Sequence, residues 1–163
     1  MISIMKKILP LVFLTLVFGN NCLAAPVQAP DVHLPTTDGE VQLASLRGKV
    51  VYLDFWASWC LPCKKSFPWM HEMKQQYADQ GLEIVAVNLD KDRGEADAFL
   101  RQMQVNFIVA FDEKGDTASM YQLKGMPSSY LIGRDGKVRA SHVGFRESDK
   151  LQLEQAVKRL LDQ

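Results

Sequence analysis

The sequence predicts an α/β domain with a mixed central sheet and helices on both of its faces. Residues 49–56 and 83–89 are apolar, β-branched runs of the kind found in strands that are buried on both faces. Helical patterns alternate with these runs, which favours parallel strands joined by right-handed helical crossovers. Residues 129–132 and 137–143 form two further runs. The Arg134-Asp135-Gly136 turn between them predicts an antiparallel hairpin at one side of the sheet.

Residues 1–24 have the layout of a secretory signal peptide. Lys6-Lys7 forms a short positive region, the largely apolar run 8–18 follows, and Cys22-Leu23-Ala24 offers small residues where a signal peptidase reads. We expect cleavage after the alanine, so that residues 25–163 form the mature domain in the periplasm without stable membrane insertion. A retained membrane anchor and a lipoprotein cut before the cysteine are alternatives, although a spanning helix needs about 20 apolar residues.

Turn and helix signals complete the first half of the predicted order. Asp38-Gly39 lies between two short apolar pieces and predicts a small N-terminal hairpin. A helix is expected to begin shortly after residue 60 and to end at Gly81. Its apolar residues recur at helical spacing: Phe67, Met70, Met73 and Tyr77.

The second half adds three helices and a strand to the hairpin of residues 129–143. We expect helices over 94–103 and 117–123, with a strand over 107–111 between them. Ser148 is expected to cap a last helix. The inner face of that helix carries Leu153, Val157, Leu160 and Leu161.

The composition excludes several classes of function. With 47% hydrophobic and 23% charged residues, the chain has the composition of an ordinary globular protein. Its 19 basic and 19 acidic residues cancel, so the sequence lacks the basic footprint of a nucleic-acid-binding protein. A membrane-surface role driven by Lys and Arg is equally unsupported. We expect no cofactor and no metal.

Two cysteines three residues apart carry the chemical signal. Cys60 lies between the end of a buried strand and the start of a helix, where free N–H groups and the helix dipole favour a thiolate. Cys63 lies one turn further on. This spacing would let the first thiolate attack a target disulfide and the second cysteine resolve the mixed disulfide.

The cysteine pair has two other interpretations. A structural zinc site needs four ligands, but the sequence has no second pair, and its histidines, His33, His71 and His142, are widely spaced. An inert structural disulfide would close so small a loop that it would add little stability.

The stretch Asp54-Phe55-Trp56-Ala57-Ser58-Trp59-Cys60-Leu61-Pro62-Cys63-Lys64 resembles the active-site segment of thioredoxin. Gly125-Met126-Pro127 resembles the cis-proline loop of that family, and residues 131–144 resemble its closing hairpin. The N-terminal hairpin and the central strand–helix insertion around 94–111 look like the exported TlpA/ResA-like thiol–disulfide oxidoreductases. The resemblance therefore implies a thioredoxin-like fold over the mature chain.

The resemblance also implies roles for individual residues. Cys60 would be the attacking cysteine and Cys63 the resolving one. Pro127 would be the cis-proline opposite the pair, with the Met126 backbone presented to an extended substrate strand. Asp54 would be a buried acid beneath the resolving cysteine. Its pKa should rise on burial, which suits proton exchange.

The surrounding residues and two departures from the family pattern refine these expectations. Trp59 would form part of the surface that contacts the partner, although packing alone is an equal alternative. Ser66 stands where many ResA-like relatives carry an acid, so Asp54 would act alone. Ser128 follows the proline where cytochrome-assembly relatives often have Glu, which weakens a role in cytochrome c maturation.

The expected function is that of a periplasmic reductant of protein disulfides, kept reduced by a membrane-embedded thiol donor. Retention of Pro62 resembles the reducing members of the family. Cytochrome c maturation is one alternative. A copper-binding chaperone that uses His142 with the cysteines is another, and a peroxiredoxin-like peroxidase is a third.

Overall fold

The computed structural model describes residues 27–163, so the predicted signal peptide of residues 1–24 lies outside the described residues. A five-stranded mixed sheet forms the centre in the order β5-β4-β3-β6-β7, and a two-stranded sheet, β1-β2, lies beside it. The strands are β1 (His33–Pro35), β2 (Glu40–Gln42), β3 (Val50–Trp56), β4 (Leu82–Asn88), β5 (Ile108–Phe111), β6 (Ser128–Ile132) and β7 (Val138–Val143).

The two strongest strand predictions are confirmed at the centre of the sheet. Every residue of β3 and of β4 is buried, as their continuous apolar character predicts. These two strands run parallel, and β3 also pairs with β6 in the antiparallel direction. The last hairpin, β6-β7, therefore continues the sheet on the side of β3 that β4 does not occupy.

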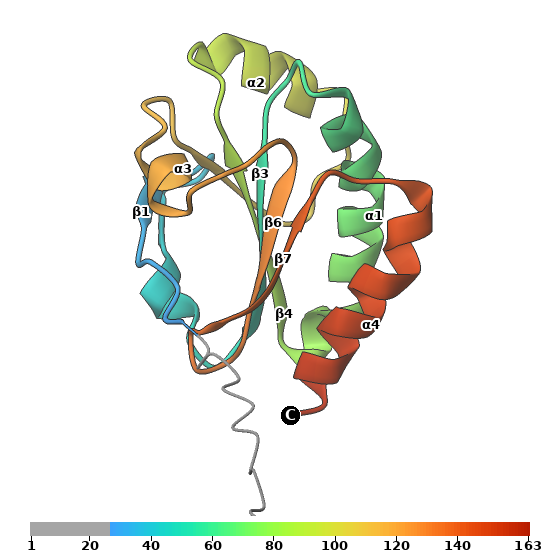
Figure 1. Ribbon diagram of the computed structural model, residues 1–163. Helices are drawn as coiled ribbons and strands as arrows, with labels where there is room; N and C mark the ends of the chain where they lie inside the picture. The colour runs from blue at the N-terminus through green and yellow to red at the C-terminus, as the bar shows by residue number, and fades with distance from the viewer. Residues whose placement is uncertain (1–26) are drawn as a thin grey trace, which may run out of the picture.

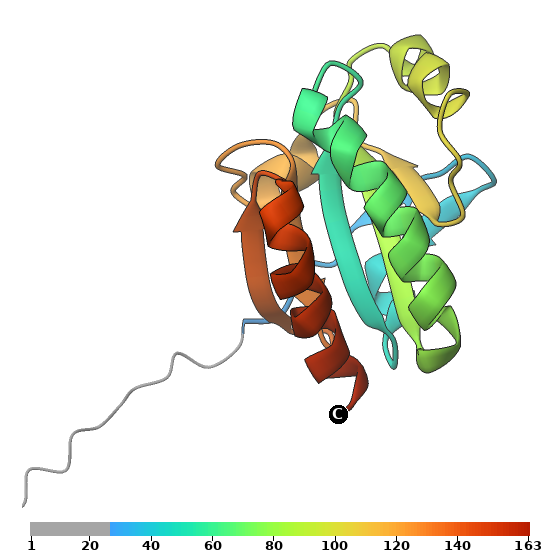
Figure 2. The ribbon, with the colours of Figure 1, turned by 90° about the vertical axis from the view of Figure 1, so that its right-hand side faces the viewer.

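Helices α1 (Leu61–Tyr77) and α4 (Lys150–Leu161) cover one face of the sheet, as Figures 1 and 2 show. Helix α2 (Arg93–Leu100) crosses the end of the sheet where β3 and β4 finish. The core beneath α1 is strongly aromatic. Trp56, Phe67 and Phe99 have ring centroids 4.8 to 5.0 Å apart, and they join β3, α1 and α2.

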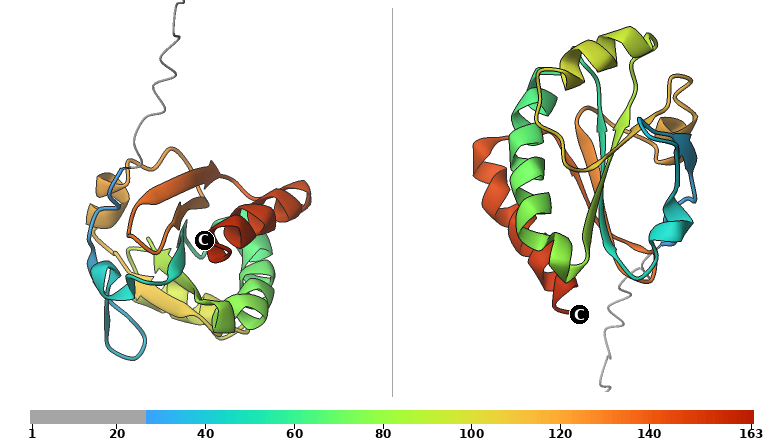
Figure 3. Two further views of the ribbon diagram at one scale, coloured as in Figure 1. Left: turned by 90° about the horizontal axis from the view of Figure 1, so that it is seen from below. Right: turned by 180° about the vertical axis from the view of Figure 1, so that it is seen from behind.

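The opposite face is covered by the N-terminal hairpin and by the short helix α3 (Asp116–Met120) (Figures 1 and 3). The predicted hairpin is confirmed: β1 and β2 pair, and Gly39 occupies the turn with a positive φ of 146°. Its inward side chains, Leu34 and Val41, pack against the residues of β3 that point away from α1. The fold is thus α/β and thioredoxin-like, with both faces of the sheet covered.

Three boundary predictions are wrong. Helix α2 ends at Leu100 rather than at residue 103. Helix α3 ends at Met120 rather than at residue 123, because Gln122 adopts a left-handed conformation with φ 52°. Ser148 does not cap the last helix but lies inside a short 3-10 helix (Glu147–Asp149). There the Asp149 carboxylate accepts a hydrogen bond from the Arg146 N–H at 2.9 Å, so the acid performs the local capping.

Among residues 27–163, no helix is long and apolar enough to cross a membrane. The fold brings three chain segments to one end of the sheet. These are the carboxyl ends of β3 and β4 and the start of β6, because Phe55 pairs with both Val87 and Ser128. This is the end at which α1 begins (Figure 2), and ligand sites of α/β sheets lie outside the carboxyl ends of the strands.

Candidate active site

The cysteine pair lies at the junction of β3 and α1. Cys60 and Cys63 form a disulfide with an S–S distance of 2.01 Å. Cys60 is the N-cap of α1, and its Sγ accepts a hydrogen bond from the Cys63 N–H at 3.3 Å. Once the disulfide is reduced, this N–H group and the dipole of a 17-residue helix favour a thiolate at Cys60. The predicted position of the pair at a helix start is confirmed.

Burial distinguishes the two sulfurs. Cys60 keeps a small exposed fraction of 4%, whereas Cys63 is fully buried at 0%. Both cysteines are buried, and only the first keeps any exposed surface. Cys60 is therefore the cysteine nearer the surface, and Cys63 lies behind it, one helical turn away.

The loop before Cys60 is fixed by an acid that the sequence analysis missed. Asp90 follows β4, is 1% exposed, and accepts hydrogen bonds from the Ser58 N–H at 2.8 Å and the Ser58 Oγ at 3.0 Å. The Asn88 side chain donates a third bond at 2.7 Å. Hydrogen bonds to charged groups are among the strongest in proteins. In the sequence, the signal for this acid is the polar pair Asn88 and Asp90 at the end of an apolar strand.

The Met126–Pro127 peptide bond is cis. Ser128 pairs with Phe55 of β3, so Pro127 lies next to the end of β3 from which the cysteine loop departs. The Pro127 carbonyl accepts a hydrogen bond from the Gly144 N–H at 2.8 Å, and Ser128 Oγ donates to the Gly125 carbonyl at 2.7 Å. The loop is therefore held from both sides. Met126 is half-buried against the α1 core.

Asp54 lies in the middle of β3, and its side chain points to the face covered by α1. Alternation along the strand establishes this, because its neighbours at i±2, Tyr52 and Trp56, belong to the core beneath α1. Asp54 is 1% exposed, and its Oδ2 has no hydrogen-bond partner among residues 27–163. Burial raises the pKa of the Asp54 carboxyl well above its ordinary value. The predicted rise is thus confirmed.

Exposed apolar side chains flank the cysteine pair. Trp59 is 69% exposed and Leu61 is 64% exposed, although both are sequence neighbours of the buried Cys60. Val143 is 53% exposed at the end of β7, in the row that contains Phe55 and Ser128. Large exposed apolar side chains gathered near a reactive group indicate a surface that contacts other proteins.

Two other residues that the sequence singled out do not join the chemistry of the pair. Ser66 is buried, and its Oγ donates to the Cys63 carbonyl at 3.0 Å, so it serves the helix backbone. His142 lies on β7 with its Nε2 3.3 Å from Asp149 Oδ2. Within the described chain, no three His, Cys, Asp or Glu side chains gather into a possible metal site. The copper set of His142 with both cysteines is therefore not formed.

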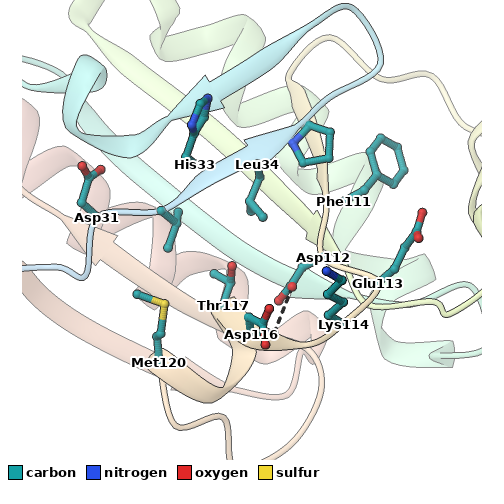
Figure 4. A pocket seen from close by; sticks show the side chains of 12 residues that line it. Asp31, His33, Leu34, Phe111, Asp112, Glu113, Lys114, Asp116, Thr117 and Met120 are labelled. Carbon is teal, nitrogen blue, oxygen red and sulfur yellow. Dashed lines mark hydrogen bonds between the residues drawn. The ribbon is translucent and has the colours of Figure 1, made fainter.

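A cavity of about 480 Å³ lies between β1, the end of β5 and α3 (Figure 4). None of the site residues named above lines it. Its acidic side chains include Asp112, whose carboxylate accepts hydrogen bonds from the Asp116 and Ala118 N–H groups. This acid therefore stabilises the start of α3, and the cavity adds nothing to the cysteine chemistry.

The sequence matches the AhpC/TSA family over residues 26–141. The chain therefore belongs to this family. It also resembles curated ResA thiol–disulfide oxidoreductases. It is 35% identical to that of Bacillus thuringiensis subsp. konkukian over 82% of this chain and 76% of that protein. Against the Bacillus subtilis ResA it is 36% identical over 74% and 68%. The predicted membership of the ResA-like thiol–disulfide oxidoreductases is confirmed.

Solved structures agree with this family assignment. A putative thiol:disulfide interchange protein DsbE from Chlorobium tepidum superimposes with a TM-score of 0.83 at 53% identity, over 83% of this chain and 96% of that one. A putative protein disulfide isomerase from Bacteroides thetaiotaomicron gives a TM-score of 0.77 at 29% identity, over 85% and 90%. The solved structures therefore support both the thioredoxin-like fold and the assignment of this chain to the ResA-like oxidoreductases.

Proposed function

We propose that this oxidoreductase reduces disulfide bonds of other proteins in the periplasm. The observation that carries the proposal is the asymmetric pair. Cys60 touches the surface at the start of α1, beside an exposed Trp59, while Cys63 is buried behind it. This arrangement suits a two-step exchange with a large partner. The partner's disulfide would meet Cys60 first, and Cys63 would then resolve the mixed disulfide from inside the protein.

The reaction balances with the residues present. The Cys60 thiolate attacks one sulfur of the target disulfide, and the other target sulfur leaves as a thiolate that takes a proton. Cys63 then loses its proton to Asp54 and attacks Cys60 Sγ, and the second target thiolate leaves. Two electrons pass to the target, and the Cys60–Cys63 disulfide of this structure is the product.

The loop that contains the cis peptide positions the substrate in this proposal. Pro127 lies next to the end of β3, and Met126 precedes it on the side from which a partner approaches. An extended segment of the target would align with the Met126 backbone, as in other cases where a peptide strand adds to a protein edge. Trp59 would supply apolar contact area for that partner.

The site needs a source of electrons after each turnover. Residues 1–24 resemble a signal peptide, and we place the mature domain in the periplasm, where disulfides persist. A membrane-embedded thiol donor would then return the pair to the dithiol form. The clients could be limited to apocytochromes c, the substrates of cytochrome c maturation. The following experiment distinguishes this narrower class from a broader range of proteins with disulfides.

The variant Cys63→Ser tests the proposal by trapping. It keeps the attacking sulfur but removes the resolving one, so a mixed disulfide with the natural client accumulates and is identified by mass spectrometry. Cys60→Ser is the matched control and traps nothing, because the remaining cysteine is fully buried. Equal trapping by the two variants, or no protein adduct with either, contradicts the proposal.

A further inference from the structure

Asp54 needs a path to solvent if it exchanges a proton in every turnover. Asp54 is 1% exposed, and within the part of the chain that the structure describes its Oδ2 has no hydrogen-bond partner. On one side β4 places Ala86 directly opposite, which cannot carry a proton. Tyr52 shares its face of β3, and α1 covers that face with Cys63. On the other side β6 places Ser129 directly opposite. The serine is thus the one proton carrier that a neighbouring strand pairs with this acid.

Asp54, Ser129 and His142 form a row across three strands. Asp54 of β3 pairs with Ser129 of β6, and Ser129 pairs with His142 of β7. Directly opposed residues of antiparallel strands project to the same face, with Cβ atoms about 4.5–5.5 Å apart. The row therefore leads in two short steps from the buried centre of the sheet to its β7 edge.

A cavity of about 150 Å³ accompanies the outer part of this row. Ser129, His142 and Tyr52 line it from the sheet, and Gln152 and Arg159 line it from α4. A water molecule occupies about 30 Å³ in the liquid, so the cavity has room for a few waters among several polar partners. Ser129 is 4% exposed, whereas the His142 side chain is 30% exposed. The His142 Nε2 atom itself is buried and has no hydrogen-bond partner among residues 27–163.

We propose that Ser129 and His142, together with water in this cavity, carry protons between Asp54 and solvent. The proposal rests on the function proposed above and adds two relay residues to it. When Asp54 releases its proton, the Ser129 hydroxyl or a water accepts it and passes one of its own to the imidazole, which releases a proton to solvent. No electrons move, and the same steps in reverse return a proton to the acid.

Acidic side chains lie at both ends of the row. Burial raises the pKa of Asp54 and so favours its protonated form, and that proton must leave before Cys63 can donate one. Asp149 faces the histidine at 3.3 Å. Desolvation raises the pKa of Asp149, but hydrogen bonds from the Arg146 N–H and the Ser148 hydroxyl lower it below the ordinary value overall. The Asp149 carboxylate and Arg159, which lines the cavity from α4, are charged groups beside the outer part of the row.

Reaction of the reduced protein with Ellman's disulfide measures the resolving step, which needs the relay, separately from the first attack. The reduced protein releases one coloured thiolate when Cys60 attacks and a second when Cys63 resolves the adduct. We expect His142→Gln and Ser129→Ala to slow the second release about 10-fold and to leave the first release unchanged. This loss is smaller than the full contribution of general acid–base catalysis, because Asp54 itself is still present. Imidazole buffer should restore the second rate, and Ser129→Thr, which keeps the hydroxyl, should retain it.

His33→Gln is the matched control for the histidine change, because His33 pairs with Glu40 in the exposed hairpin and should have no effect. The relay is wrong if the second release keeps its normal rate in both relay variants. It is equally wrong if both variants are slow and imidazole restores neither, since that outcome indicates a structural role. Loss of the first release in the unmodified protein would instead contradict the proposed oxidoreductase function itself.

Discussion

Replacing Asp54 by Asn should change how stability depends on pH. The folded-state pKa of this carboxyl is raised by burial, while the unfolded chain has the ordinary value of about 3.9. Between these two values the folded protein holds a proton that the unfolded chain has lost. Stability from this group is therefore complete below the unfolded pKa and is lost as pH rises through the folded pKa.

The magnitude follows from the linkage relation. Each pH unit between the two pKa values removes about 1.4 kcal/mol of unfolding free energy from the wild type, and Asp54→Asn has no such loss. The difference between the two proteins should thus grow in favour of the variant as pH rises above about 4, and become constant above the folded pKa. Other ionisable groups cancel, because both proteins share them.

Urea unfolding of the oxidised proteins, at a series of pH values from acid to mildly alkaline, measures this difference. Asp79→Asn, which makes the same substitution at an exposed acid after α1, is the matched control. A difference between wild type and Asp54→Asn that stays flat across the series would refute the reasoning. It would mean that Asp54 titrates with the same pKa in the folded and unfolded states.

Three further outcomes test other parts of the structure. Asp90→Ala should lower the unfolding free energy by about 2–4 kcal/mol, because three hydrogen bonds to a buried carboxylate are lost. The capping variant Asp92→Ala should lose only about 1 kcal/mol, so equal losses in urea unfolding contradict the anchoring role. Trp59→Ala should slow reaction with a protein client about 10-fold yet leave the rate with Ellman's disulfide unchanged, since the side chain is 69% exposed; equal slowing of both reactions opposes a partner-contact role. Burial raises the pKa of Glu83, but the ion pairs with Lys74 at 2.6 Å and with Lys49 lower it overall. Glu83→Gln should therefore cost about 1–2 kcal/mol at neutral pH, a cost that disappears as pH falls through the lowered pKa; an equal cost in strong acid contradicts the ion-pair explanation.

The sequence predicted what depends on local pattern. Apolar runs located β3 and β4, helical spacing located α1, and Asp38-Gly39 located the hairpin turn, because each signal lies within a few neighbouring residues. The cis bond before Pro127 was expected only from family resemblance. About 5–6% of X–Pro bonds in folded proteins are cis, and no local residue marks this one.

The missed features depend on contacts between distant segments. Asp90 holds Ser58 across 32 positions of the chain, and nothing near either residue reports the partner. The row of Asp54, Ser129 and His142 depends on the register of three strands, and a shift of one residue would turn each side chain to the other face. Ser148 was wrongly expected to be a cap because the neighbouring Asp149 carboxylate bonds to the Arg146 N–H instead.

A redox titration of the intact protein tests the central claim most directly. The number of free thiols is measured after equilibration in buffers of graded potential. Proteins of this fold span about −270 to −120 mV. We predict that Cys60 and Cys63 open and close together in a single two-electron step, with a midpoint near the reducing end of that range. A pair that stays oxidised in every buffer, or a midpoint near −120 mV, would contradict the account of this protein as a disulfide reductant.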